Sequence, residues 1–312
     1  MSYPAVDPEI QNLLDTADTG VFPVYGLDEV LADPARYAVL RDLPDTPADD
    51  RVTTENLFIP GPGGQLRLRV YRPVTDEILP VILYIHGGAY TYGSPEAEEG
   101  RSLRYAAEAE AVVVSVDYRL APEHPFPAPA DDAYAALVWI GEHAADIGGD
   151  PERIAVAGGS AGGNLATSTV LRARDLAGPE VIFQSLTYPG VDTTATSDSM
   201  RTAGDLPVLN RRAMELALEY YTGGENLDPY ASPLHADDLS GLPPTFIAVA
   251  EIDPLRDEGR QYAERLSASG VTTEFIQVPG AVHGFDLLFP QARISERNLA
   301  DQVRALRDAL HK

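Results

Sequence analysis

Continuous apolar runs that alternate with helical segments are the feature that most limits how this chain can fold. Residues 80–85 read PVILYI and residues 111–116 read AVVVSV, and the segment Glu98–Glu110 between them has helical spacing. Short apolar runs of this kind are typical of strands buried on both faces of a sheet. Strands that alternate with helices predict an α/β fold with a mostly parallel sheet that helices cover on both faces.

Eight strands are predicted along the chain. The first two form a hairpin across a turn rich in proline and glycine, and six more follow. The expected strands are Thr53–Ile59, Gln65–Tyr71, Pro80–Ile85, Ala111–Val116, Arg153–Ala157, Val181–Tyr188, Thr245–Ala250 and Thr272–Val278; the expected helices are Glu98–Glu110, Ala128–Ala145, Ala161–Asp175, Leu255–Ala268 and Gln291–Leu310. Ligands of such a sheet bind where its parallel strands end, so functional residues are expected just after the strands.

Charge and composition exclude several classes of protein. The 312 residues include no cysteine, which excludes disulfides, zinc–thiolate sites and a cysteine nucleophile. The formal net charge of −25 repels nucleic acid and anionic lipid. The sequence shows no secretory signal and no apolar stretch of the roughly 18 residues that a membrane helix needs. We therefore expect a cytoplasmic protein that binds neither nucleic acid nor a membrane, and we assign it no metal and no cofactor.

Two segments interrupt the alternation of strands and helices. Residues 1–45 contain the helical pieces Asp7–Ala17 and Leu27–Leu40, and residues 190–225 contain a polar loop, Asp192–Asp205, and a helix, Asn210–Tyr221. We expect both to form a helical cap over the active site, because the second follows a strand at the catalytic edge. The core would then comprise residues 46–189 and 226–312. The alternative is a pair of surface elaborations with no catalytic role.

A glycine-rich turn surrounds Ser160. Residues 158–162 read GGSAG, which is the G-x-S-x-G pattern of a nucleophile elbow, and they stand between a predicted strand and a predicted helix. Side chains at Gly158 and Gly162 would collide with neighbouring backbone in such a sharp turn. We predict that Ser160 is the nucleophile. The alternative is a tight turn with an incidental serine.

A second glycine-rich segment, residues 86–89, follows the first buried strand. It reads HGGA and resembles the HGGG oxyanion loop of lipases and esterases. In such a loop backbone N–H groups donate to the oxyanion of a tetrahedral intermediate. The expected donors are Gly87 and Gly88, with the Ala161 N–H as the third. The alternative is a plain turn after a strand.

The catalytic base must follow the serine and the acid in this fold. The chain order is serine, then aspartate or glutamate, then histidine, and only three histidines follow Ser160. His311 lies at the C-terminus, and His235 precedes the strand that should carry the acid. His283 follows the predicted strand Thr272–Val278, at the edge where the base belongs. We therefore predict that His283 is the base.

Three carboxylates compete for the role of the acid. Glu251, Asp253 and Asp257 all follow the predicted strand Thr245–Ala250. Asp257 falls in the first turn of the next helix, where an acidic residue is ordinary, and Glu251 is nearest the strand end and stays an alternative. Asp253 lies just past the strand, before a proline that ends it. We predict that Asp253 holds the tautomer of His283.

Several motifs in this order resemble the hormone-sensitive-lipase-like family of α/β-hydrolase esterases, the bacterial family IV carboxylesterases. The resemblance covers residues 50–290 and rests on HGG at 86–88, DYRLAPEHPFPA at 117–128, GGSAGG at 158–163, SPL at 232–234, DPLRDEG at 253–259 and HGF at 283–285. It implies the α/β-hydrolase fold, a helical cap, the triad of Ser160, Asp253 and His283, and oxyanion donors at Gly87, Gly88 and Ala161. It also implies that residues 117–128 support the oxyanion loop.

The resemblance implies hydrolysis of short-chain acyl esters through a serine acyl-enzyme. The expected substrate is a small uncharged ester, and a homodimer is left open. Two residues depart from the family motifs: Ala89 replaces the last glycine of HGGG, and Gly159 stands where an aspartate is common. The alternatives are an amidase, a lactonase or a dehydratase on the same scaffold, or a relative that binds small molecules without catalysis.

Overall fold

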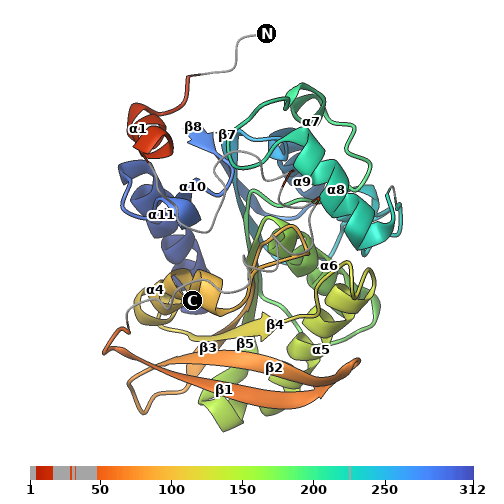
Figure 1. Ribbon diagram of the computed structural model, residues 1–312. Helices are drawn as coiled ribbons and strands as arrows, with labels where there is room; N and C mark the ends of the chain where they lie inside the picture. Colours follow the sequence, from red (N-terminus) through yellow and green to blue (C-terminus); the bar gives the residue numbers. More distant parts are fainter. Residues whose placement is uncertain (1–4, 17–28, 30–31, 33–47, 225) are drawn as a thin grey trace.

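A single eight-stranded sheet forms the centre of the molecule (Figure 1). The structure is a computed structural model that describes residues 5–16, 29, 32, 48–224 and 226–312. The strands are β1 (Val52–Gly61), β2 (Gly64–Pro73), β3 (Leu79–Ile85), β4 (Val112–Asp117), β5 (Gly149–Gly159), β6 (Phe183–Thr187), β7 (Thr245–Ile252) and β8 (Thr273–Val282). All eight predicted strands are therefore present, with ends that differ by a few residues.

The strand order is β1-β2-β4-β3-β5-β6-β7-β8. β1 and β2 pair antiparallel as the predicted hairpin, and β2 pairs antiparallel with β4. All the other neighbouring pairs, from β4 across to β8, are parallel. This topology confirms the predicted mostly parallel sheet, and it brings the carboxyl ends of β5, β7 and β8 to one edge.

Helices cover both faces of the sheet (Figure 1). α4 (Glu99–Ala109) and α11 (Arg293–Leu310) pack on one face; α5 (Ala128–His143), α6 (Ala161–Asp175) and α9 (Arg256–Ala268) pack on the other. Shorter elements are η2 (Glu96–Glu98), η3 (Ala144–Ile147), η4 (Pro233–His235) and α10 (Phe285–Leu288). The five helices predicted between and after the strands all occur, and the last turn of the helix expected at Ala128–Ala145 tightens into η3.

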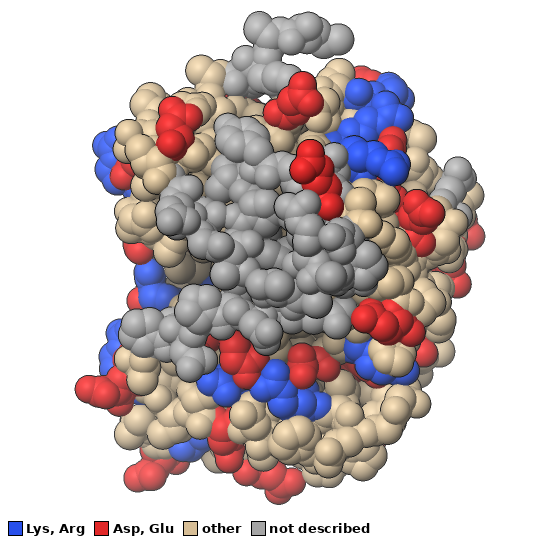
Figure 2. All heavy atoms as spheres, viewed as in Figure 1, with Lys and Arg blue, Asp and Glu red and all other residues tan. Residues whose placement is uncertain are grey.

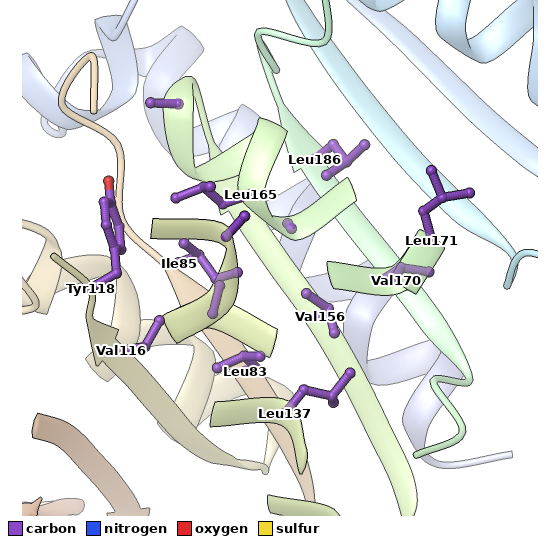
Figure 3. Close-up of a cluster of buried hydrophobic side chains, with 14 of the residues drawn as sticks. Leu83, Ile85, Val116, Tyr118, Leu137, Val156, Leu165, Val170, Leu171 and Leu186 are labelled. Atoms are coloured by element: carbon purple, nitrogen blue, oxygen red, sulfur yellow. The ribbon is translucent and has the colours of Figure 1, made fainter. Parts of the chain in front are cut away.

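The continuous apolar runs are buried on both faces, as predicted. In β3, Leu83 and Ile85 pack with residues of α5 and α6, whereas Ile82 and Tyr84 pack with residues of α4 and α11. Figure 3 shows Leu83 and Ile85 in the first of these clusters, near Leu165 of α6. Because side chains alternate along a strand, a strand between two layers of helices needs apolar residues at every position.

Part of the N-terminal segment packs beside β8. The Asp7 N–H donates to the Gly280 carbonyl oxygen in β8 at 2.9 Å. The helix α1 (Pro8–Thr16) begins at the next residue. Its buried side chains, Ile10 and Leu14, join an apolar cluster that includes Phe285. The helix predicted at 27–40 lies outside the described residues, except for Glu29 and Ala32.

The segment 190–225 contains two helices above the edge of the sheet (Figure 1). α8 (Arg211–Thr222) matches the predicted helix. α7 (Asp198–Thr202) lies inside the stretch 192–205, which was predicted to be a loop. The Ser197 hydroxyl accepts a hydrogen bond from the Met200 N–H at 3.2 Å, and this N-cap explains the extra helical turn. The ring of Tyr221 in α8 stacks on Tyr90 at 3.8 Å.

Acidic and basic side chains are interspersed on the face of the molecule that Figure 2 shows. In Figure 2, the acidic side chains on the visible face are scattered among basic ones rather than gathered into one patch. Several acidic side chains of the described residues form ion pairs with arginine, for example Glu96 with Arg67 at 2.5 Å. Among the helices that the structure describes, none has the length and apolar character to cross a membrane.

Candidate active site

Ser160 occupies the turn between the end of β5 and the start of α6. Its backbone has φ 56° and ψ −123°, a combination that costs energy for a residue with a side chain. A Cβ atom added at Gly162 would lie 2.0 Å from the Ile85 carbonyl oxygen, and one at Gly158 would lie 2.3 Å from the Gly162 carbonyl oxygen. The two glycines thus allow β3, β5 and α6 to approach closely around Ser160.

Hydrogen bonds join Ser160, His283 and Asp253. His283 directly follows β8, and its Nε2 lies 2.9 Å from Ser160 Oγ. Asp253 directly follows β7, and its Oδ2 lies 2.8 Å from His283 Nδ1. The other carboxylate oxygen, Oδ1, accepts the Leu255 N–H at 2.8 Å. Asp253 is 2% exposed and His283 7%, so water has little access to the bond between them.

The competing acids and histidines have partners elsewhere. Glu251 Oε2 accepts the Gly280 N–H at 2.8 Å, and Asp257 Oδ2 accepts the Ser199 N–H at 2.8 Å. Burial raises the pKa of Asp257, but the hydrogen bond and charge of Arg256, the Ser199 N–H and the charge of Arg260 together outweigh burial, so the pKa lies below its usual value. His235 pairs with Asp192 at 2.9 Å. Within the described residues, no three histidine or carboxylate side chains are grouped to hold a metal ion.

The oxyanion loop, residues 86–89, lies beside Ser160. A Cβ atom added at Gly87 would be 3.4 Å from Ser160 Cβ. Gly88 has φ 113°, and a Cβ atom there would be 2.1 Å from the Tyr92 carbonyl oxygen, so this position requires glycine. The Tyr118 hydroxyl donates to the His86 carbonyl oxygen at 3.0 Å, and the two rings stack at 4.2 Å. Tyr118, in the segment 117–128, thus contacts the loop through both its hydroxyl and its ring.

The sequence predicted that the Gly87 N–H would donate to an oxyanion, but in the structure this N–H already has a partner. It donates to Glu98 Oε1 at 2.6 Å. Glu98 is 5% exposed, and its other oxygen accepts a hydrogen bond from the Tyr84 hydroxyl. An N–H that already donates to a buried carboxylate is not available to an oxyanion, whereas Gly88 and Ala161 remain candidate donors.

Sequence reasoning missed the residues that pack around His283. The ring of Tyr188, which follows β6, lies 4.7 Å from the His283 ring between centroids. The Tyr188 hydroxyl donates to Asp286 Oδ1 at 2.6 Å. Asp286 comes only three residues after His283, so its position could have been noticed. Glu98 looked like an ordinary acidic residue at a helix start, and no local signal marked it.

The comparisons with known proteins agree on one family. The family described as alpha/beta hydrolase fold matches residues 82–287. The carboxylesterase NlhH of Mycobacterium tuberculosis is 42% identical over 98% of this chain and 98% of its own length. The ethyl acetate hydrolase of Pseudomonas putida is 32% identical over 98% of this chain and 100% of its own length. The solved structure of a bacterial heroin esterase superposes with a TM-score of 0.90 at 38% identity, covering 100% of both chains.

Proposed function

Because the chain belongs to the alpha/beta hydrolase fold family, in its hormone-sensitive-lipase-like branch of esterases, we propose that Ser160, His283 and Asp253 are its catalytic triad. The chain is a carboxylic ester hydrolase, as the names of its close relatives indicate. The observation that carries the residue assignment is the pair of hydrogen bonds on His283, at 2.9 Å to Ser160 Oγ and 2.8 Å to Asp253 Oδ2.

The first half of the reaction acylates Ser160. His283 Nε2 takes the hydroxyl proton as Ser160 Oγ attacks the carbonyl carbon of the ester. Asp253 accepts the hydrogen bond from His283 Nδ1–H and stabilises the imidazolium that forms. The tetrahedral intermediate then collapses, the bond to the alcohol oxygen breaks, and His283 gives its proton to the departing alcohol.

The second half releases the acid. His283 takes a proton from water, whose oxygen attacks the acyl carbon, and Ser160 Oγ leaves with that proton. The N–H groups of Gly88 and Ala161 are the proposed donors to the oxyanion in both halves. The Ala161 N–H stands at the N-terminus of α6, where the helix dipole also favours negative charge.

The proposed substrates are small uncharged esters with short acyl chains. One relative is named for ethyl acetate, which has a two-carbon acyl group. The net charge of −25 disfavours anionic substrates.

The segments 1–45 and 190–225 are proposed to cap the site. A cytoplasmic location and a homodimer stay predictions, which cell fractionation and light scattering test.

Hydrolysis of p-nitrophenyl acetate, butyrate and octanoate by wild type and Ser160→Ala tests the function. We expect the highest kcat/KM on the two shorter esters and a loss of at least about a thousandfold in the variant. A wild type that hydrolyses none of the three would contradict the esterase function on such substrates. Activity that survives in Ser160→Ala would overturn the residue assignment alone. Parallel assays of a matching amide and lactone separate the amidase and lactonase alternatives.

A further inference from the structure

Three buried charged side chains lie side by side behind the candidate active site. Glu98, Arg101 and Asp286 are each at most 6% exposed. Arg101 stands between the two carboxylates: its Nε is 3.7 Å from Glu98 Oε2, and its Nη2 is 3.2 Å from Asp286 Oδ1. A buried charge costs free energy unless it is paired and hydrogen-bonded, so the three side chains depend on one another for their positions.

One end of this group holds the oxyanion loop. Glu98 Oε1 accepts the Gly87 N–H at 2.6 Å, and Glu98 Oε2 accepts the Tyr84 hydroxyl. The first bond fixes the plane of the peptide that precedes Gly87. The next peptide carries the Gly88 N–H, a proposed oxyanion donor, and its carbonyl oxygen on Gly87 lies 2.7 Å from His86 Nδ1. Contacts on both sides of the Gly87 Cα atom therefore limit the two soft dihedrals that set the direction of the Gly88 N–H.

The other end contacts the base. Asp286 Oδ1 accepts the Tyr188 hydroxyl at 2.6 Å, and the Tyr188 ring packs against the His283 ring. Asp286 Oδ2 accepts the side-chain amide of Asn298 in α11 at 2.8 Å. Asp286 therefore anchors Tyr188 to a long helix, and Tyr188 limits the tilt of the His283 ring.

We propose that Glu98, Arg101 and Asp286 form one positioning unit that sets the oxyanion loop and His283 relative to each other. The planar guanidinium of Arg101 makes the link, because it forms an ion pair with each carboxylate, so a shift of either one changes its interaction with the other. These residues touch neither substrate nor reacting atoms and act through Gly87 and Tyr188. The proposal rests on the proposed function, since it assigns how that triad and loop are held.

Glu98→Gln tests the end of the positioning unit that holds the oxyanion loop. Glutamine has the same shape but lacks the charge that pairs with Arg101 and strengthens the bond from the Gly87 N–H. We expect kcat on p-nitrophenyl butyrate to fall about tenfold or more with KM little changed, because the oxyanion forms only after binding. The Ki of a trifluoromethyl ketone should rise by a similar factor. Ser160 Oγ adds to its carbonyl carbon and the proton passes to His283, which leaves an oxyanion at the same donors.

The matched control is Glu99→Gln. Glu99 is the next residue, is equally buried at 5% exposed, and pairs with Arg69 at 2.5 Å. It has no part in the proposed unit, so this variant should keep kcat and the Ki of the ketone close to wild type. Equal losses in both variants would show that any buried charge in this region matters, and would overturn the specific role of Glu98.

Tyr188→Phe tests the end of the positioning unit that contacts His283. It also tests the proposal if Glu98→Gln fails to fold. It keeps the ring against His283 but removes the hydroxyl that binds Asp286. We expect a lower kcat at unchanged KM. In the double variant with Glu98→Gln, the combined loss should be smaller than the product of the single losses, because both act on one unit. Independent losses, or wild-type kcat in Tyr188→Phe, would overturn the coupling. If Ser160→Ala stayed active, the proposed function itself would fail instead.

Discussion

Asp253 Oδ2 lies 2.8 Å from His283 Nδ1, although 30 residues separate the two in sequence. The loops that follow β7 and β8 create this contact, because parallel neighbours end at the same edge of the sheet. Asp257, four residues after Asp253, instead contacts α7 and two arginines of its own helix. The structure therefore separates two carboxylates that look alike in sequence.

Asp253→Asn should lower kcat on p-nitrophenyl butyrate by about three to four orders of magnitude. An amide in this position can donate to Nδ1 and so stabilise the wrong tautomer of His283. Asp257→Asn should keep activity within about threefold, because its contacts lie away from His283. Steady-state kinetics on the two purified variants checks both values. A large loss in Asp257→Asn with an active Asp253→Asn would show that the acid is misassigned.

Gly162→Ala should be strongly destabilising even though alanine favours helices more than glycine does. The added Cβ would lie 2.0 Å from the Ile85 carbonyl oxygen, which belongs to β3 and cannot move aside cheaply. Gly159→Ala is the matched control, because a Cβ there would meet the nearest atom of Tyr188 at an ordinary 3.5 Å. We expect a Tm several degrees lower in Gly162→Ala and near wild type in Gly159→Ala. Similar Tm values in both variants would contradict the steric explanation.

The stability of Glu258→Gln relative to wild type should increase as the pH rises. Burial, reinforced by the nearby Asp192, raises the pKa of Glu258 well above its usual value. The folded chain then binds a proton that the unfolded chain releases above about pH 4.3, so wild type loses stability as the pH rises toward the folded pKa. Glutamine stays neutral, and its oxygen can accept the Val191 N–H as Glu258 does at 2.7 Å.

Thermal unfolding from about pH 4 to 8 measures this effect as a gap in Tm between Glu258→Gln and wild type. The Tm of Glu258→Gln minus the Tm of wild type should increase as the pH rises. Glu264→Gln, at an exposed position on the same helix, is the control and should show no such trend. A gap that stays constant over the whole range would mean that Glu258 does not take up a proton on folding.

Tyr221→Ala should detach α8 from the core. The Tyr221 ring stacks on Tyr90 beside the oxyanion loop and meets Phe126 edge-on at 5.9 Å. Loss of a buried aromatic ring costs about 3–5 kcal/mol of unfolding free energy. Tyr221→Phe keeps both ring contacts and removes a hydroxyl that has no partner among the described residues, so its stability should equal or exceed that of wild type.

Urea unfolding measures the stability of these two variants, and KM for p-nitrophenyl butyrate reports on the proposed cap. We expect a higher KM in Tyr221→Ala, because α8 would no longer be fixed beside the site. An unchanged KM together with a large loss of stability would favour the alternative interpretation, in which segment 190–225 is a surface elaboration without a role in binding.

Local sequence patterns determined the strands, the helices and the elbow of this protein. A run such as PVILYI indicates burial on both faces of the strand. The glycines at 158 and 162 indicate a turn in which these two positions have no room for a side chain. Chain order then narrowed the histidines to His283. These features depend on residues that are close in sequence, or on an order that the fold imposes.

Tertiary structure alone decided which groups the buried polar atoms bind. The carboxylate that takes the Gly87 N–H comes from Glu98, eleven residues away, and the one that holds Tyr188 comes from Asp286, 98 residues away. Glu98 has no local signal, and the position of Asp286 close to His283 does not say which group it binds, because a hydrogen bond depends on where two distant segments meet in space. Ser160 is thus marked by its own sequence, but the distances that support its proposed role as the nucleophile exist only once β5, β7 and β8 lie in one sheet.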